Sequence, residues 1–293
     1  MIPTALAATP PPSTALATGI APALLSAAAL KGPGIWTVGP EPSAGPTDSE
    51  RILAGLTEGL APEEAEQCRR LRRPADQWAY AAAHQLLRRL LAIALGVAPA
   101  ALMLDRDPAG KPFLVWPAGS GLHFNLSHTQ DLAAVALCPT GRVGVDVEAE
   151  DRPVVLDPAL LAFALHAGER DVLAALPAPC RPAAFLRRWT VREAVAKADG
   201  RGLSLPFAAI HLTLPDPDRD GDSHSDPEAR RAAVSGEAMV TQPQAQAWRI
   251  WYRPIAPRHH LALAWQAAPA ASVTPRLCRL ALRELLPATE GQA

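Results

Sequence analysis

Three acidic residues and one lysine are spaced so that their side chains could meet. Asp146 and Glu148 stand two apart in an apolar stretch, and in a β-strand such residues share a face, about 7 Å apart. Glu193 and Lys197 stand four apart, which places them on one face of a helix together with Trp189. If that helix packs on that strand, the carboxylates converge and repel by roughly 4 kcal/mol per pair at 4 Å and an effective dielectric constant of 20. A hard divalent cation such as Mg²⁺ would relieve this repulsion.

Each of these residues also has a plainer interpretation. Asp146 and Glu148 could be solvated acids on an exposed strand face. Glu193 and Lys197 could form an ordinary surface ion pair, which contributes only about 0.3–0.5 kcal/mol. Trp189 on the same helix face argues against full exposure, because an indole ring usually requires cover.

A basic cluster and two isolated polar residues are further candidates. The cluster comprises Arg69, Arg70, Arg72 and Arg73. It is either a solvated helix end, where cations suit the helix dipole, or a phosphate clamp, since arginine binds phosphate oxygens bidentately. His128, which follows Ser127, could be a satisfied core histidine, and Lys111, which precedes Pro112, could be a turn lysine.

The elements that must position these residues follow from hydrophobic periodicity and from glycine and proline. Helices are expected near residues 50–56 and over 62–73, 76–95, 158–165, 169–176, 181–199 and 276–286, and strands over 35–38, 123–128, 132–137, 143–148, 248–252 and 261–265. Gly96 and Gly200 are natural ends for two of the helices. Because helices and strands mix without regular β-α-β alternation, the predicted fold class is α+β.

Composition excludes several classes of function. The chain has 293 residues with 28 basic and 29 acidic side chains, so it has no overall field to attract nucleic acid or an anionic membrane. Its four cysteines are far apart, which argues against zinc and against a disulfide framework. No apolar run approaches the roughly 20 residues of a membrane helix, and no early positive charge marks a signal peptide. These features predict a cytoplasmic protein.

Two segments have the composition of irregular chain. Residues 1–45 are rich in alanine and proline, and we expect a disordered leader in which the strand at 35–38 is an exception. Residues 215–230 are crowded with Asp, Pro, Ser and Gly, which indicates a flexible insertion.

Several motifs in order resemble one family. They are Gly110-Lys-Pro-Phe113, Phe124-Asn-Leu-Ser-His128, Gly144-Val-Asp-Val-Glu148 and Trp189-Thr-x-Arg-Glu-Ala-x-x-Lys197, followed by Gly200-Arg-Gly-Leu-Ser-Leu-Pro206. Each motif alone is modest, but their order and spacing resemble the 4'-phosphopantetheinyl transferase family, in its larger, two-lobed, surfactin-type class. The resemblance runs from about Glu63 to Trp265.

The resemblance implies an activity and a fold. Members of the family transfer the phosphopantetheine arm of coenzyme A to a serine of an acyl or peptidyl carrier protein and release adenosine 3',5'-bisphosphate. The fold would be two similar α+β lobes related by a pseudo-twofold axis, over residues 46–142 and 143–268. Residues 269–293 lie outside the resemblance and are expected to be a tail. The resemblance also implies a monomer.

The resemblance also implies roles for particular residues. Asp146, Glu148 and Glu193 would hold Mg²⁺, and Lys197 would contact the leaving phosphate. Ser127 and His128 would meet the 3'-phosphate of coenzyme A, and the turn with Lys111 and Pro112 would lie against the adenine nucleotide. Further cations would come from Arg69, Arg70 or Arg73. The base that activates the carrier serine would be either Glu193 or a water on the metal, and the sequence leaves both open.

Two positions depart from the family pattern. Arg192 replaces the first lysine of the motif that begins at Trp189, and Ala79 stands where the family has an arginine near the 3'-phosphate. Two other functions compete with the transferase: a binding module for coenzyme A or a carrier protein, and a Mg²⁺-dependent phosphohydrolase with the same acids.

Overall fold

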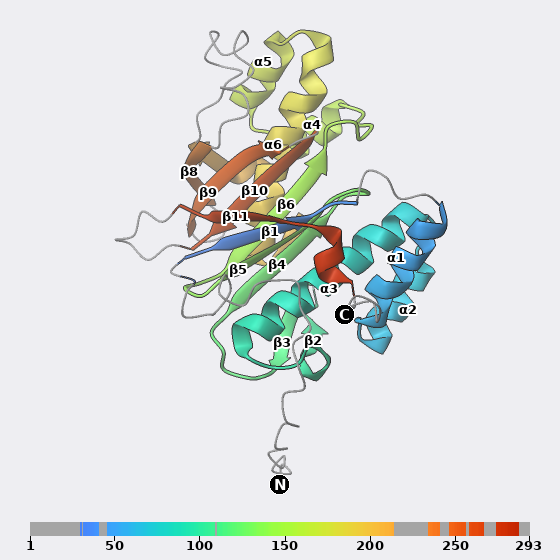
Figure 1. Cartoon of the computed structure of the whole chain (residues 1–293). Coiled ribbons are helices and arrows are strands. Elements are labelled where there is room, and N and C mark those ends of the chain that lie inside the picture. Colours follow the sequence, from blue (N-terminus) through green and yellow to red (C-terminus); the bar gives the residue numbers. More distant parts are fainter. Residues whose placement is uncertain are drawn as a thin grey trace.

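The computed structural model has an α+β fold, as the sequence predicts (Figure 1). It describes residues 30, 32–40, 46–108, 110–213, 234–240, 246–255, 258–266 and 274–286. The helices are α1 (Pro46–Glu58), α2 (Pro62–Arg70), α3 (Pro74–Leu95), α4 (Pro158–Ala164), α5 (Ala167–Ala175) and α6 (Arg181–Asp199). The strands are β1 (Gly34–Val38), β2 (Met103–Arg106), β3 (Pro112–Trp116), β4 (His123–His128), β5 (Ala133–Cys138), β6 (Val143–Ala149), β7 (Ile210–Thr213), β8 (Val234–Val240), β9 (Gln246–Ile255), β10 (His259–Trp265) and β11 (Arg276–Leu280).

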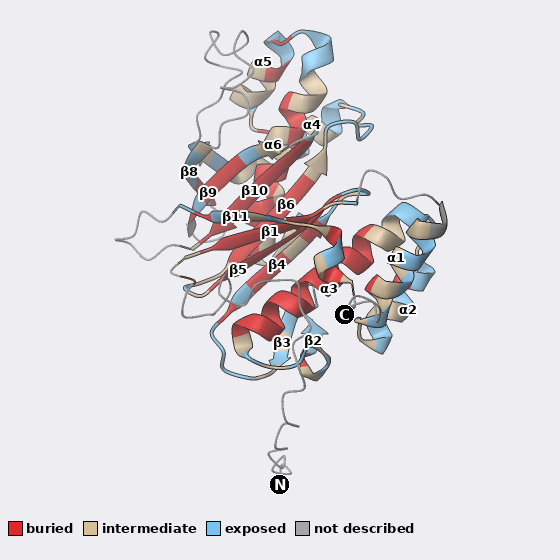
Figure 2. Cartoon of the chain, in the orientation of Figure 1, coloured by how far each residue is buried: buried red, intermediate tan, exposed pale blue. Residues whose placement is uncertain are grey.

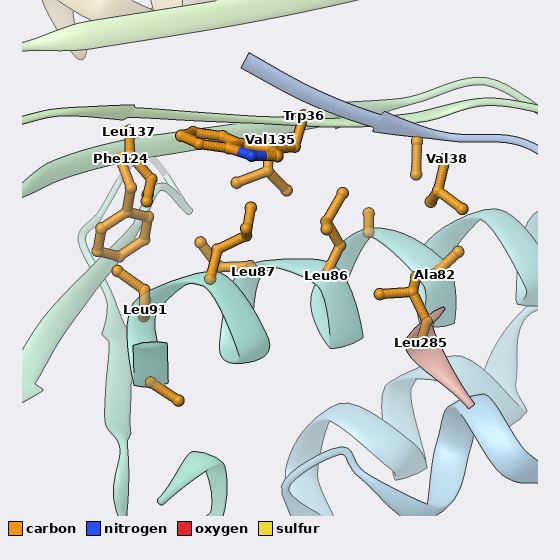
Figure 3. Close-up of a cluster of buried hydrophobic side chains, with 14 of the residues drawn as sticks. Trp36, Val38, Ala82, Leu86, Leu87, Leu91, Phe124, Val135, Leu137 and Leu285 are labelled. Atoms are coloured by element: carbon orange, nitrogen blue, oxygen red, sulfur yellow. The ribbon is translucent and has the colours of Figure 1, made fainter. Parts of the chain in front are cut away.

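The first sheet has the strand order β11-β1-β5-β4, and the long helix α3 lies against one of its faces. Apolar residues at helical spacing on α3, such as Leu86 and Leu87, pack against Trp36 and Val135 of the sheet (Figure 3). The helix ends at Gly96, whose φ of 67° is the left-handed conformation that glycine adopts most easily. The antiparallel pair β2–β3 forms a separate ribbon beside this unit.

The second sheet has the strand order β6-β10-β9-β8-β7, with every neighbouring pair antiparallel. Helix α6 packs on it, and residues such as Ala194 and Val195 share an apolar cluster with Ile250 and Ala262. Figure 2 shows how much of β6, β9 and β10 is buried beneath this cover. Each sheet therefore has one long helix on one face.

A further apolar cluster is shared by the two sheets. It joins Ile35 and Ala134 of the first sheet to Val145 and Leu263 of the second. Because side chains alternate along a strand, Val145 points toward the first sheet while Asp146 points toward α6. The layers are therefore α3, the first sheet, the second sheet and α6. Asp146 lies on the face of the second sheet that α6 covers.

Polar side chains connect β4 to β6. The backbone N–H of Val145 donates to Asn125 Oδ1 at 2.9 Å, and that of Val147 donates to Ser127 Oγ at 3.3 Å. Residue numbers increase in the same direction along both strands, from Asn125 to Ser127 and from Val145 to Val147, so β4 and β6 run parallel. Two short side chains thereby replace a backbone ladder and tie the first sheet to the strand that carries Asp146.

The predicted helix over residues 276–286 is wrong. Residues 276–280 are strand β11, which pairs in parallel with β1, and residues 282–285 form a 3₁₀ helix. The apolar residues of this segment do have helical spacing, but the other edge of β1 would be unpaired without β11. Leu282 and Leu285 pack into the α3 cluster, and Arg89 donates to the carbonyl of Glu284 at 3.1 Å.

Other differences from the predicted elements are smaller. Strands β2, β7 and β8 were not anticipated, whereas β1 lies where a strand was expected within the first 45 residues. The rest of the predicted leader up to residue 29, and most of the predicted insertion near 215–230, lie outside the described residues. Along the described part of the chain, no helix has both the length and the apolar character needed to cross a membrane.

Candidate active site

Gly144 allows the close approach of α6 and β6 that creates the site. A Cβ atom at this position would lie 2.1 Å from the carbonyl oxygen of Ala194 and 2.4 Å from the backbone nitrogen of Ala198. Only a residue without a side chain permits that contact between the strand and the helix backbone. Asp146 lies two residues farther along the same strand face, beneath the helix face that carries Glu193 and Lys197.

Asp146 is the centre of a cluster of three polar side chains. The residue is only 4% exposed, and its Oδ1 accepts from Lys197 Nζ at 2.6 Å and from Ser127 Oγ at 2.9 Å. Lys197 Nζ also donates to Ser127 Oγ at 2.9 Å. The other carboxylate oxygen of Asp146, Oδ2, is buried without a hydrogen-bond partner. Lys197 therefore pairs across to the strand, and the interpretation of Asp146 as a solvated acid is wrong.

Glu148 and Glu193 lie within the electrostatic influence of Asp146. Burial, followed by the charges of Asp146 and Glu148, raises the pKa of Glu193 to about 7, although Lys197 and Arg152 oppose the rise. Burial and the charge of Asp146 also raise the pKa of Glu148, which pairs with Arg152. The three acids from the strand and the helix therefore share one partly buried region, where the charge of Asp146 disfavours ionisation of both glutamates.

The oxygen donors of this region suit a hard divalent cation, although they are not gathered around one point. Among the residues that the structure describes, no group of three or more His, Cys, Asp or Glu side chains is arranged to hold a metal ion. Asp146 is turned toward Lys197, and Glu148 is turned toward Arg152. The unpartnered Oδ2 and the mutual repulsion of three acids are what a Mg²⁺ ion would compensate, so the donor set fits that ion.

Ser127 and His128 are neighbours in β4 with different surroundings. The hydroxyl of Ser127 is buried and bonds to Asp146, Lys197 and the N–H of Val147. His128 is exposed at the end of the strand, where its ring meets that of Tyr80 edge to face at a centroid distance of 6.4 Å. The structure thus brings Ser127, but not His128, into the Asp146 cluster.

Lys111 and Pro112 follow a tight turn at the start of β3. Gly110 has a φ of 83°, its N–H donates to the carbonyl of Asp107 at 2.8 Å, and the N–H of Lys111 donates to Asp107 Oδ1 at 2.9 Å. The Lys111 ammonium points inward and donates to the carbonyl of Lys197 at 2.5 Å. The turn also lines an open pocket of about 410 Å³, which includes none of the three acids and therefore lies apart from them.

The predicted arginines lie at the end of α2 and immediately before α3. Arg69 and Arg70, on the last turn of α2, are exposed and both pair with Glu66. Arg73 is the residue that precedes α3. Tyr80, which contacts His128, comes about two helical turns later on α3. This placement puts the arginines on the α3 side of the molecule, away from the helix that carries Glu193.

Trp189 and Arg192 are residues of α6 whose side chains pack the helix against its neighbours. The Trp189 ring packs near those of Phe185 and Phe207, at centroid distances of 5.9 and 5.3 Å. Arg192 is fully buried, pairs with Glu169 of α5 and donates to the carbonyl of Phe207. Although Arg192 is adjacent to Glu193 in sequence, it points in a different direction, toward Glu169 and Phe207.

Two cations near the site were not foreseen from the sequence. Arg152 pairs with Glu148, and Arg142 donates to the carbonyl of Asp199 at the end of α6. Arg152 follows Glu148 by four residues, but that spacing has no meaning where a strand passes into a loop. Arg142 immediately precedes β6, and no local pattern relates it to a helix that begins about forty residues later.

Two family models match consecutive parts of the chain. Residues 142–248 match the model described as the 4'-phosphopantetheinyl transferase superfamily. Residues 45–140 match the model described as the N-terminal region of 4'-phosphopantetheinyl transferase. The first match contains Asp146, Glu148, Glu193 and Lys197, and the second contains Lys111 and His128. The junction of the two matches falls immediately before β6.

Curated relatives carry the same description. The 4'-phosphopantetheinyl transferase HetI of Nostoc sp. (strain PCC 7120) is 35% identical over 170 residues, which are 57% of this chain and 71% of the relative. A 4'-phosphopantetheinyl transferase of Bacillus subtilis is 30% identical over 169 residues, 58% of this chain and 71% of the relative. The transferase Sfp of Bacillus subtilis (strain 168) is 27% identical over 185 residues, 61% of this chain and 77% of the relative.

Proposed function

This chain belongs to the 4'-phosphopantetheinyl transferase superfamily, and we propose that it moves the phosphopantetheine arm of coenzyme A to a serine of an apo acyl or peptidyl carrier protein. The reaction would depend on Mg²⁺ and release adenosine 3',5'-bisphosphate. The observation that carries the proposal is the buried meeting of Asp146 and Lys197 beside Glu193, whose pKa of about 7 reflects the neighbouring acids.

We assign the metal to Asp146, Glu148 and Glu193. When bound, Mg²⁺ would neutralise the diphosphate of coenzyme A and make its phosphorus more electrophilic. The unpartnered Oδ2 of Asp146 supports the assignment, because a buried carboxylate oxygen without a partner is costly.

The side chains of this chain would handle the proton and the leaving group. The serine oxygen forms a bond to the phosphorus that carries the pantetheine arm, and the bond from that phosphorus to the bridging oxygen breaks, so the bisphosphate leaves with that oxygen. The proton of the serine hydroxyl would pass either to Glu193 or to a water beside the metal. Lys197 would offset charge on the departing bisphosphate.

We place coenzyme A in a cleft between the two lobes, outside the apolar cluster that joins their sheets. His128 and the cations Arg69, Arg70 and Arg73 would attract its 3'-phosphate, and the turn at Lys111 and Pro112 would lie against the adenine nucleotide. Ser127 would also meet the 3'-phosphate, by exchanging its hydrogen bonds to Asp146 and Lys197. Two lobes related by a pseudo-twofold axis, with a boundary just before β6, agree with one sheet and one long helix in each. The protein would act as a cytoplasmic monomer.

A panel of apo carrier proteins tests the proposal. We expect incubation with coenzyme A and Mg²⁺ to add one phosphopantetheine arm, seen as a mass gain of the intact carrier. Asp146→Ala should abolish the gain without unfolding the protein. Glu237→Gln, which changes an exposed acid on β8, should retain it. Coenzyme A binding without modification of any carrier would indicate a binding module, and consumption of coenzyme A without a carrier would indicate a phosphohydrolase.

A further inference from the structure

The C-terminal end of α6 is capped by two cations from outside the helix. A helix leaves its last four carbonyls without partners of its own. Here the carbonyl of Ala196 accepts from the N–H of Gly200 at 2.9 Å. The carbonyl of Lys197 accepts from Lys111 Nζ at 2.5 Å, and that of Asp199 accepts from Arg142 Nη1 at 2.8 Å. Positive charge at this end also complements the helix dipole.

Lys111 is positioned by three hydrogen bonds that join Asp107 to Gly110 and to Lys111 itself. The side chain and carbonyl of Asp107 accept from Lys111 and Gly110, and the N–H of Asp107 donates back to the carbonyl of Lys111 at 3.0 Å. The ammonium then lies between two elements of the second sheet unit, 2.5 Å from the carbonyl of Lys197 and 3.5 Å from that of Val143. Burial, followed by the charge of Arg142, lowers the pKa of Lys111 to about 8, as expected for an enclosed ammonium.

Lys197 is therefore held at both of its ends. Its backbone carbonyl is bonded to Lys111, and its side-chain ammonium is bonded to Asp146 and Ser127. A shift of the last turn of α6 would move the Lys197 ammonium relative to the strand. Misplacement by about 1 Å can lower a rate by as much as 100-fold.

We propose that Lys111 is a positioning residue for Lys197, which it holds by capping the carbonyl of that residue, and that its ammonium is not a ligand of the nucleotide. The proposal rests on the transferase function. Turning the ammonium toward a nucleotide would leave the Lys197 carbonyl unbonded at the negative end of a helix. The backbone of the turn and the ring of Pro112 remain available to lie against the nucleotide.

A comparison of two cap variants tests this role. We expect Lys111→Met to lower kcat about 10- to 100-fold while the KM for coenzyme A changes by less than about 3-fold. Arg142→Met, which removes the cap from Asp199 two residues farther on, should lower kcat less at a similar loss of stability. Lys111→Met combined with Lys197→Met should be no slower than Lys197→Met alone, because the two residues act as one unit. Lys111→Arg should recover part of kcat.

Two measurements need no carrier protein, so they separate this proposal from the transferase function. In Lys111→Met, hydrogen exchange should speed up in the last turn of α6, and the Kd for coenzyme A by calorimetry should stay within about 3-fold. A Kd that weakens tenfold or more with unchanged exchange would make Lys111 a nucleotide ligand and overturn the proposal. Equal losses of kcat in Lys111→Met and Arg142→Met would show that Lys111 only stabilises the fold, and this would also contradict the proposal. If Lys111→Met does not fold, Lys111→Gln gives the same comparison.

Discussion

Glu64 and Glu193 are two largely buried carboxylates beside the two long helices, and their ionisation is affected in opposite ways. Glu64, on α2, accepts from His84 and Arg88 of α3, at 3.1 and 2.5 Å, and from the N–H of Ala61 at 3.0 Å. Burial alone would raise the pKa of Glu64, but the hydrogen bonds and charges of His84 and Arg88 outweigh it and lower the pKa to about 2. Near Glu193, burial and the acids Asp146 and Glu148 instead raise the pKa to about 7.

The difference separates a polar cluster that stabilises the fold from one prepared for a ligand. Around Glu64 the chain supplies its own partners, and Arg88 also bonds to the carbonyls of Pro99 and Leu102. Around Glu193 the acids outnumber the cations that reach them, and one oxygen of Asp146 has no partner. A buried excess of like charge costs stability, so its presence points to a function that requires it.

The largest expected effect comes from closing the gap between α6 and β6. Gly144→Ala would force a methyl group into backbone atoms that cannot move aside, so we expect the free energy of unfolding to fall by roughly 3 kcal/mol or more. Gly168→Ala on α5 is the matched control, because its added Cβ would meet no atom closer than 3.5 Å. Urea unfolding of both variants measures the difference. Equal stabilities would show that the glycine is not required for the packing that forms the acid cluster.

The next largest effect should appear in the cluster of Glu64, His84 and Arg88. Glu64 has a folded pKa of about 2 against an ordinary value of 4.5, so its ionised form contributes stability above pH 4.5, and this is lost as the pH falls toward 2. The shift corresponds to roughly 3 kcal/mol at neutral pH. Glu64→Gln should therefore lower the free energy of unfolding by about that amount at pH 7, with a difference that shrinks below pH 4.5. Urea unfolding from pH 7 to about 2.5 measures this, and a difference independent of pH contradicts the comparison.

Replacement of Glu193 by Gln should change the free energy of unfolding in the opposite direction and by a smaller amount. The folded pKa of Glu193 lies above its ordinary value of 4.5, so its ionisation costs stability, increasingly as the pH rises from 4.5 through about 7. With metal removed by EDTA at pH 8, Glu193→Gln should raise the free energy of unfolding by roughly 1–2 kcal/mol, reduced from the full shift by solvent screening. Thermal or urea unfolding decides the sign. Destabilisation as large as that from Glu64→Gln would show that Glu193 is not under repulsion from its neighbours.

The side chains that share a face of each element could be predicted, because this depends on local spacing, whereas the packing of α6 on β6 was expected only from the family resemblance. The alternation that pairs Asp146 with Glu148 and the helical spacing of Glu193 and Lys197 are properties of short segments, and the helix Arg181–Asp199 has a glycine stop at Gly200. The cations that pair with the acids could not be predicted from local spacing. Arg152 acts from a loop, and whether Lys197 bonds to Asp146 or Glu193 depends on how closely α6 approaches the strand.

The remaining errors are of longer range. Strand β11 exists because β1, near the other end of the described chain, offers it an edge, and no window within residues 276–286 contains that information. The sequence made no prediction for the direction of Arg192, which faces Glu169 of α5, a partner 23 residues away. Lys111 was placed correctly in a turn, whereas the direction of its side chain depends on α6.

Binding of Mg²⁺ to the protein loaded with coenzyme A is the most direct test of the claim that these three acids form a metal site. Calorimetric titration should show one Mg²⁺ bound by the unaltered chain and by Glu237→Gln, and binding at least about 100-fold weaker for Asp146→Asn. Affinity that is the same in all three proteins, or absent in all three, would contradict the account.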